Sequence, residues 1–375
     1  MIIGCVKEVK NAENRVGLMP SHVFEYVNAG HSVFVERDLG IGSGFNNQEY
    51  RDAGATVLDD AKAVWDLAEM MIKVKEPMAS EYDLMKPDSI IFTYFHLADN
   101  KPLASVLLEK RISAVAYETV TDANGRLPLL RPMSEVAGRL SIQEGEKYLE
   151  GHYGGKGILL SGVPGVRGGH VVIIGAGVVG TSAVKTALGT GATVSVLDRD
   201  LNRLAYLEDV FNGQISTIYS DETNLRAELM RADIVVGSVL IPGDKAPKIV
   251  RREHLALMGK GTVLIDVAID QGGCFETSRP TSHVDPIFIE EGIVHYCVTN
   301  MPGAVPKTST YALGNATLPY GLKIANLGLH DAIMSDVHLK DGLNTFGAQV
   351  TNRAVAKALN LEFVDYEKCV KYVKS

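Results

Sequence analysis

The sequence lacks any uninterrupted apolar run of roughly 18 residues, the length that would suggest a membrane-spanning helix. Its first residues reach Lys7 and Glu8 too early to form a signal-peptide apolar segment of about 7–15 residues. The cysteines are few and far apart, without a C-x-x-C pair, which argues against a disulfide framework and a zinc site (Cys5, Cys274, Cys297, Cys369). We expect a soluble, cytoplasmic protein with no bound metal and no membrane partner.

Positive charge is also in short supply. The chain has 37 Lys and Arg against 45 Asp and Glu, a formal net charge of −8. This balance disfavours binding to nucleic acid or to an anionic membrane as the main role. An acidic ligand would therefore need local positive groups. The 375 residues, 46% of them hydrophobic, are enough for two domains at roughly 150 residues each.

Short β-rich runs alternate with stretches of helical period in two blocks, which favours parallel sheets covered on both faces. The sequence therefore predicts an α/β protein with two doubly wound, Rossmann-like domains. The first block has expected strands at 2–6, 31–35, 70–74, 90–95 and 113–117, with helices at 21–28, near Glu49 and at 102–110. The second has expected strands at 170–174, 193–197, 215–219, 233–236 and 262–265.

Two longer helical stretches, 132–150 and 306–326, join the blocks, and Gly314 and Pro319 predict a bend in the second. The glycine-rich segment 151–169 is typical of a functional or mobile loop. The last 45 or so residues, helical around 349–359 and β-rich at 363–364, are too few for a third domain. We expect a discontinuous substrate domain (1–128 with 307–375) and a nucleotide domain (129–306).

The clearest motif is the G-x-G-x-x-G formed by Gly175, Gly177 and Gly180, directly after an expected strand and at the start of an expected helix. The first glycine would allow the tight turn, and the second would let the backbone approach a pyrophosphate. The third would let helix and strand pack closely, and the helix N-terminus would face the negative charge. The pattern alone is weak, and its value here comes from its position.

Asp198 ends the next expected strand, close to the spacing of roughly 20 residues expected for the acid that binds the adenosine ribose. A carboxylate accepts hydrogen bonds from both ribose hydroxyls but repels a 2′-phosphate, so NAD is favoured over NADP. Arg199 and Arg203 leave NADP open, since a basic residue beside the acid can accommodate that phosphate. Alternatively, both arginines are solvated residues at the start of a helix.

Read together, several further motifs resemble the family of alanine dehydrogenase and the NAD-binding subunit of transhydrogenase, over essentially the whole chain. They are NRVGLMP at 14–20, KVKEP at 73–77, FTYFHL at 92–97, DVAIDQGG at 266–273 and VTNMPGAVP at 298–306. The resemblance implies reversible oxidative deamination of L-alanine to pyruvate and ammonium. It also implies NAD as the hydride acceptor, a reaction in a cleft between the domains, and a homohexamer.

Cations are expected around the carboxylate of such a substrate. Arg15 fits a bidentate anchor, and its alternative is a surface arginine that pairs with Glu13. A second cation would polarise the 2-oxo group, and strand periodicity puts Lys73 and Lys75 on the same face. The family match selects Lys75, which leaves Lys73 as a solvated strand residue or a neighbour that tunes the charge of Lys75.

The reaction also needs a base. His96 follows an expected strand, where α/β folds place their ligands, and imidazole titrates near neutrality. Asp270 follows another expected strand beside glycines and could equally remove a proton, so the choice between the two stays open. Asp266 is the competitor of Asp270, and the family match favours Asp270 and leaves Asp266 as a structural acid at the strand end.

The remaining expected contacts surround the nucleotide. By resemblance, Ser134 contacts it from the linking helix, and Asn300 and Met301 lie near the nicotinamide. Ser220 would approach the adenine side. The apolar neighbours expected at the cofactor are Val178, Val179, Val239, Leu240 and Val267.

Two other functions compete with an amino-acid dehydrogenase. A transhydrogenase-type subunit would pass hydride between nucleotides and would not need Arg15, Lys75 and His96 around a carboxylate. A non-catalytic NAD-responsive protein would keep Asp198 and the glycines but not the chemistry. Amino-acid-independent NAD binding would favour the latter.

Overall fold

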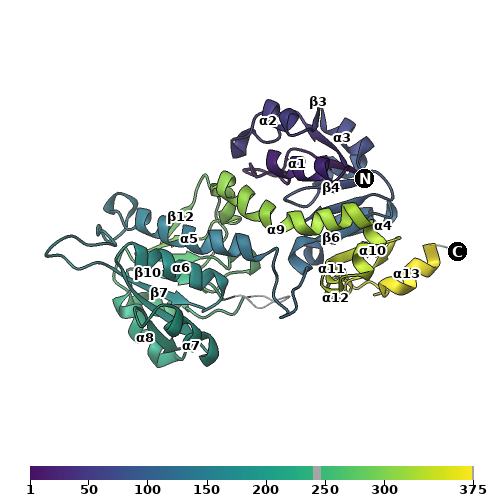
Figure 1. Ribbon diagram of the computed structural model, residues 1–375. Coiled ribbons are helices and arrows are strands. Elements are labelled where there is room, and N and C mark those ends of the chain that lie inside the picture. The colour runs from purple at the N-terminus through teal and green to yellow at the C-terminus, as the bar shows by residue number, and fades with distance from the viewer. Residues whose placement is uncertain (240–245, 374–375) are drawn as a thin grey trace. The chain divides into compact units, whose positions relative to one another are not determined.

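The computed structural model describes residues 1–239 and 246–373, with side chains for 1–239 and 246–370. The chain forms two compact units (Figure 1). One combines Met1–Pro132 with Val305–Ser375, and the other is Met133–Ala304. The first unit is thus built from two separate stretches of sequence.

An eight-stranded sheet forms the centre of the first unit, in the order β15-β14-β6-β5-β4-β1-β2-β3. Strands β1 to β6 are parallel, and β14 and β15 add an antiparallel edge. The order reverses between β1 and β4, which is the switch point where doubly wound sheets bind ligands. The strands are β1 Ile2–Cys5, β2 Ser32–Glu36, β3 Thr56–Leu58, β4 Met70–Ile72, β5 Ile90–Thr93, β6 Ser113–Ala116, β14 Leu343–Phe346 and β15 Gln349–Val350.

Several helices of the first unit start at a side-chain cap. Asn46 and Glu49 form a reciprocal capping box at α2, and Asn100 caps α4. Helix α3 buries Val64 and Trp65 in the core formed with the sheet. The helices are α1 Pro20–Asn28, α2 Asn47–Asp52, α3 Ala61–Leu67, α4 Lys101–Glu109, α9 Pro306–Leu327, α10 Leu329–Met334, α11 Val337–Asp341, α12 Arg353–Leu359 and α13 Tyr366–Val373.

The second unit has a seven-stranded sheet in the order β12-β13-β11-β10-β7-β8-β9. Only β12 is antiparallel to its neighbour, and the order reverses between β7 and β10. The strands are β7 His170–Ile174, β8 Thr193–Asp198, β9 Ser216–Tyr219, β10 Ile234–Gly237, β11 Val263–Asp266, β12 Ile287–Glu290 and β13 Ile293–Tyr296. The helices are α5 Arg131–Tyr148, α6 Val178–Gly189, α7 Leu201–Val210 and α8 Glu222–Arg231.

The expected fold class is confirmed: both units are doubly wound α/β sheets, and the first is discontinuous. The expected helix over 349–359 is wrong in its first part. β15 occupies Gln349–Val350, because Gly347 and Ala348 both adopt positive φ (53° and 67°) and reverse the chain after β14. Elements that the sequence did not indicate are β3, α3, β12, β13, α10, α11 and α13, with the antiparallel edge strands β14 and β15.

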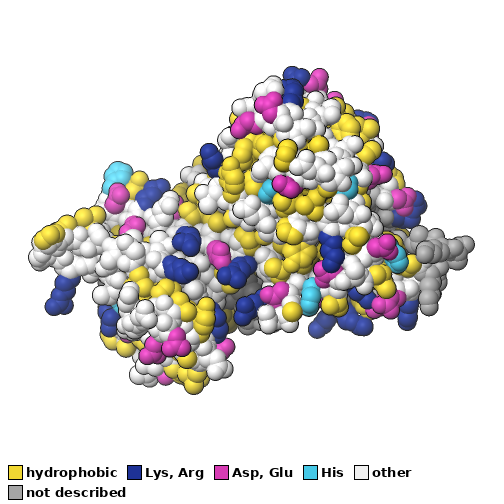
Figure 2. Space-filling model, in the orientation of Figure 1, with side chains coloured by type: hydrophobic (Ala, Val, Ile, Leu, Met, Phe, Trp, Pro, Cys, Tyr) yellow, Lys and Arg dark blue, Asp and Glu magenta, His cyan; other side chains and the backbone are white. Residues whose placement is uncertain are grey.

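Both basic and acidic side chains are visible over much of the face shown in Figure 2. Among the described residues, every helix is too short or too polar to cross a bilayer.

Candidate functional site

The expected substrate residues of the first unit follow strands at one edge of its sheet. Arg15 lies in the loop after β1, Lys75 follows β4, and His96 follows β5. Since β1, β4 and β5 are parallel neighbours, their carboxyl ends meet at the switch point. The structure therefore brings Arg15 and Lys75 close enough for the charge of one to affect the other.

Arg15 is buried, with only 2% of its surface exposed, and it forms a bidentate ion pair with Glu13. The Arg15 Nε donates to Glu13 at 2.7 Å, and Nη2 donates to the second carboxylate oxygen. Burial alone would lower the pKa of Arg15, but the hydrogen bonds and charge of Glu13 raise it above its ordinary value. The alternative of a surface arginine is therefore wrong, although the pairing with Glu13 that it predicted is present, and the expected role of Arg15 as a substrate anchor stays a prediction.

Lys75 is half-buried beside this pair. Burial lowers the pKa of its ammonium, and the positive charges of Arg15 and Lys10 lower it further. Among the described residues, no group accepts a hydrogen bond from that ammonium. The backbone is fixed, since Thr93 donates its hydroxyl to the Lys75 carbonyl at 3.0 Å. Lys75 therefore presents an unneutralised cation next to the switch point.

Lys73 was expected as a solvated strand residue or a neighbour that tunes Lys75, and the solvated alternative is wrong. Its side chain is 0% exposed and lies between the carboxylates of Glu8 and Glu81. Strand β4 ends at Ile72, so both lysines lie beyond the strand. Periodicity could not separate them, because burial of Lys73 depends on two glutamates from other segments.

His96 is exposed and held in a left-handed conformation, with φ at 47°. The Glu118 carboxylate accepts the backbone N–H groups of Phe95 and His96, the latter at 2.6 Å. The imidazole stacks on Tyr94, with ring centroids 6.1 Å apart. Left-handed backbone costs energy in a residue with a side chain and is found where surrounding contacts impose it. Glu118 supplies that constraint, and the sequence carried no signal for it.

The glycine motif of the second unit lies between β7 and α6. Gly175 has φ of 110°, which an L side chain rarely adopts, and the space beside Gly177 is open. A Cβ on Gly180 would come within 1.9 Å of the Gly175 carbonyl oxygen, so helix and strand pack closely there. Ser238, after β10, donates to the carbonyls of Ile174 and Gly175 at 2.9 and 3.1 Å. No pattern in the sequence indicated this hydroxyl.

Asp198 ends β8 and is bonded to the same turn. One carboxylate oxygen accepts the Ala176 N–H at 2.6 Å, and the other accepts the Asp200 N–H at 2.9 Å. Arg203 donates from Nε and Nη2 to the Ala176 carbonyl at 3.1 and 2.7 Å. Because of these two hydrogen bonds, Arg203 is not simply a solvated residue at the start of a helix. Arg199 is exposed and donates weakly to the Ser220 carbonyl at 3.4 Å.

The other residues expected at the nucleotide lie at the ends of neighbouring strands or at the start of α6. Leu240 lies outside the described residues. The half-buried or exposed members are Val178 and Val179 in the first turn of α6, Ser220 after β9, Val239 after β10 and Val267 after β11. They share the carboxyl edge with Gly177 and Asp198.

Ser134 lies in the first turns of α5, and Met301 is buried in a short 3₁₀ turn after β13. Asn300 adopts positive φ (57°), and its carbonyl lies 3.2 Å from His283 Nε2. These positions are distinct from the glycine turn in sequence, and their expected nucleotide contacts stay predictions.

Asp270 is exposed in a 3₁₀ turn that follows β11. Asp266, four residues earlier, is fully buried and accepts the backbone N–H groups of Cys274 and Phe275 and the Ser278 hydroxyl. Burial raises the pKa of Asp266, while these hydrogen bonds act in the opposite direction. Asp266 therefore organises the loop, and Asp270 is the acid open to solvent.

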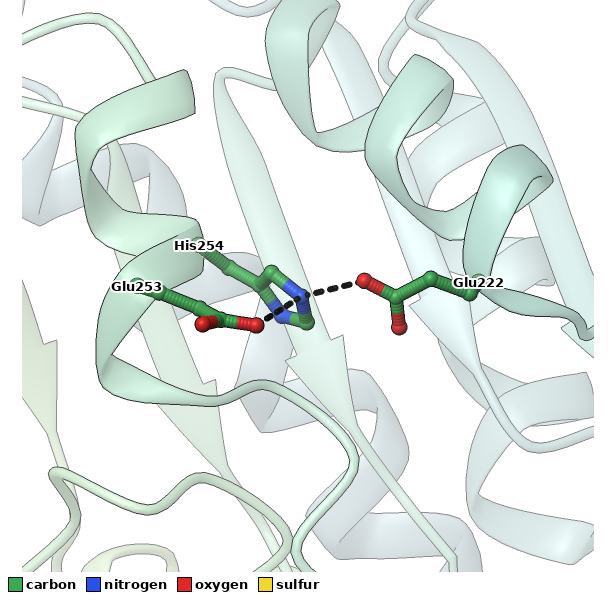
Figure 3. A group of neighbouring side chains, drawn as sticks. All are labelled: Glu222, Glu253 and His254. Atoms are coloured by element: carbon green, nitrogen blue, oxygen red, sulfur yellow. Dashed lines mark hydrogen bonds and ion pairs between the residues drawn. The ribbon is translucent and has the colours of Figure 1, made fainter.

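One histidine–carboxylate group lies elsewhere in the second unit (Figure 3). His254 Nε2 is 3.0 Å from Glu222, and its Nδ1 accepts the Arg251 N–H. Hydrogen bonding to His254, with the nearby arginines, lowers the pKa of Glu222. Arg251 also pairs with both Glu222 and Glu253. These partners account for the group as an ion-pair network.

Comparison with known proteins identifies the family of the chain. Family models match residues 4–137 ("Alanine dehydrogenase/PNT, N-terminal domain") and 141–353 (the C-terminal domain). Alanine dehydrogenase of Methanococcus maripaludis is 52% identical over 99% of this chain and all of that protein. Alanine dehydrogenase 2 of Staphylococcus aureus is 50% identical over 99% of this chain and all of that protein.

Solved structures give the same result. An L-alanine dehydrogenase matches with a TM-score of 0.93 and 49% identity, over 96% of this chain and 99% of that one. A transhydrogenase from Sinorhizobium meliloti shares the fold, with a TM-score of 0.82 and 22% identity over 94% of this chain and 100% of that one. With both domain models matched and half of its residues identical to those of full-length relatives, the chain belongs to the alanine dehydrogenase/PNT family.

Proposed function

We propose that this protein catalyses the reversible, NAD-dependent oxidative deamination of L-alanine to pyruvate and ammonium. The observation that carries the proposal is the ammonium of Lys75, which lies beside Arg15 at the switch point of the first sheet and has no ion-pair partner within the described part of the chain. The full-length relatives named alanine dehydrogenase support the choice of substrate.

Lys75 is the cation best suited to the substrate's negative groups. Glu13 already engages the Nε and Nη2 edge of Arg15 and offsets its charge. Lys75 has no such partner among the described residues, and an anion beside it would satisfy a half-buried charge. We therefore assign Lys75 to the substrate carboxylate or 2-oxo oxygen, with Arg15 adding positive potential beside it.

The glycine turn of the second unit fits a dinucleotide. Open space at Gly177 and the N-terminus of α6 suit a pyrophosphate, and Asp198, whose carboxylate also accepts the Ala176 N–H, would accept hydrogen bonds from ribose hydroxyls. NAD supplies the hydride acceptor when it is bound. Arg203 is engaged with the Ala176 carbonyl, which supports a role in holding the turn and favours NAD over NADP.

Proton transfer is assigned to His96 or Asp270. Both side chains are exposed, as a group that exchanges protons with solvent must be. Glu118 fixes the backbone of His96, which favours a defined imidazole position. Which of the two is the principal base stays open, and the homohexamer and the cytoplasmic location stay predictions.

The test is NADH formation, followed by absorbance at alkaline pH, with purified protein, NAD and L-alanine. Parallel reactions contain other amino acids or NADP, and the products are identified as pyruvate and ammonium. Turnover with L-alanine and NAD supports the proposal. NAD binding without turnover of any amino acid would favour an NAD-responsive protein instead.

A further inference from the structure

A buried charged group is centred on Lys73, two residues before Lys75 in the chain. The Lys73 ammonium is 3.1 Å from one oxygen of Glu8 and 3.0 Å from one oxygen of Glu81. The three side chains are between 0% and 4% exposed. Glu8 follows β1, Lys73 follows β4, and Glu81 lies in the 3₁₀ helix Ala79–Leu84. The group therefore ties three segments together at the switch point.

Each glutamate uses its second oxygen to hold backbone near Lys75. Glu8 accepts the Val74 N–H at 2.6 Å, and Glu81 accepts the Met78 N–H at 2.9 Å. Lys75 itself is thus flanked by a fixed Val74 on one side. Thr93 and Tyr94 of the β5 side bond to the carbonyls of Lys75 and Val74. The backbone that carries the free ammonium is held from several directions.

Joining these segments through buried charges costs free energy, which a role in stability alone does not explain. Burying three charges carries a large desolvation penalty, and apolar side chains of similar volume often stabilise as well or better. The hydrogen bonds that Glu8 and Glu81 accept from the Val74 and Met78 N–H groups, however, are directional and define backbone positions more sharply than apolar contact does. A catalytic or binding group needs placement to within about 0.5 Å. The flexible side chain of Lys75 cannot supply this placement unless its backbone is fixed.

We propose that Lys73 is a positioning residue of the reaction, which acts through Glu8 and Glu81 to fix the backbone that presents Lys75. This inference rests on the proposed function. Lys73 touches neither substrate nor cofactor and serves only to place the ammonium that does. Displacement of Lys75 by about 1 Å would reduce the efficiency of catalysis by up to about 100-fold.

The first experiment compares Lys73→Met with Lys73→Arg and with Lys62→Met. Lys62 is an exposed lysine of the same unit, paired only with Asp66 one helical turn away. For Lys73→Met we expect the KM for L-alanine and pyruvate to rise at least about tenfold, while the KM for NAD changes less than about twofold. Lys73→Arg keeps a cation for both glutamates and should recover part of the loss. Lys62→Met should match the wild type.

The pH profile separates positioning from stability. The charges around Lys75 are Arg15, Lys10, Glu13 and Glu76, and burial contributes most to its lowered pKa. If loss of Lys73 loosens the backbone around Val74 and Lys75, the Lys75 ammonium becomes more exposed to solvent and its pKa rises. The alkaline limb of kcat/KM for pyruvate then moves to higher pH. A purely structural role would lower the melting temperature without moving that limb.

Glu8→Gln provides the second variant should Lys73→Met fail to fold, since it preserves shape and removes one charge. We expect the same rise in the KM for alanine, smaller in size. A folded Glu8→Gln or Lys73→Met protein with an unchanged KM and an unchanged alkaline limb overturns the inference. If the wild type itself turns over no amino acid, the proposed function fails first, so the two failures are distinguishable.

Discussion

Lys75 and Arg15 share one corner of the first sheet, yet among the described residues the arginine has a carboxylate partner and Lys75 has none. Glu13 pairs with Arg15 in the protein interior, whereas the ammonium of Lys75 has a pKa lowered by burial and by Arg15 itself. A half-buried cation in this state gains from the arrival of an anion. The candidate substrate site is therefore a single unneutralised charge held beside a neutralised one.

The alkaline limit of the reaction with pyruvate should depend on Lys75. A lysine binds a carboxylate only in its charged form, so kcat/KM falls as the pH rises through the pKa of Lys75. Glu76 raises that pKa, and Glu76→Gln should move the limb to lower pH, by up to about one unit. Initial rates between pH 7 and 11 test this, with exposed Glu109→Gln as the control. If the alkaline limb of kcat/KM does not move in Glu76→Gln, a group other than Lys75 sets it.

Gly180 should tolerate no side chain. A Cβ there would meet the Gly175 carbonyl oxygen at 1.9 Å, so Gly180→Ala must push α6 away from the turn. We expect a loss of about 1–3 kcal/mol in the free energy of unfolding and weaker NAD binding. Gly189 lies in the same helix, where an added Cβ would meet nothing within 4 Å, and Gly189→Ala is the matched control. Equal NAD affinity of the two variants would contradict the close-packing role.

Asp198 should determine the choice of nucleotide. Asp198→Ala removes the charge that repels a 2′-phosphate but also the acceptor of the Ala176 N–H. NAD efficiency should therefore fall, and the ratio of NADP to NAD efficiency should rise about tenfold or more. Steady-state rates with both nucleotides measure the ratio, with exposed Asp209→Asn for comparison. An unchanged ratio would mean that other groups discriminate the nucleotides.

Stability should decline in mild acid. Burial lowers the pKa of three histidines in the folded protein, so the unfolded chain binds protons more readily below its ordinary histidine pKa of about 6.5. The free energy of unfolding should consequently fall as the pH drops from 7.5 to 5.5, which urea titration measures. The three are His22, His170 and His295. His295→Gln should flatten the dependence in comparison with exposed His152→Gln, and parallel profiles would contradict the assignment.

Much of the fold and of the nucleotide turn followed from sequence pattern, because strand, glycines and acid are local features. Gly175, Gly177 and Gly180 stand at the expected strand–helix junction, and Asp198 ends the next strand. The partners that shape the substrate end depend on tertiary contacts. Nothing in the period of β4 indicates that Glu8 and Glu81 bury Lys73, and nothing near His96 points to Glu118.

The central claim is that Lys75 provides the positive charge for the substrate of an alanine-deaminating reaction. The most direct measurement is kcat/KM for L-alanine with NAD, for the wild type, Lys75→Met and Lys62→Met. We expect kcat/KM of Lys75→Met to fall about 1,000-fold or more, because the substrate then loses its charged partner in a half-buried site. The kcat/KM of Lys62→Met should stay within about twofold of the wild type. A folded Lys75→Met protein with wild-type efficiency toward alanine would contradict the claim.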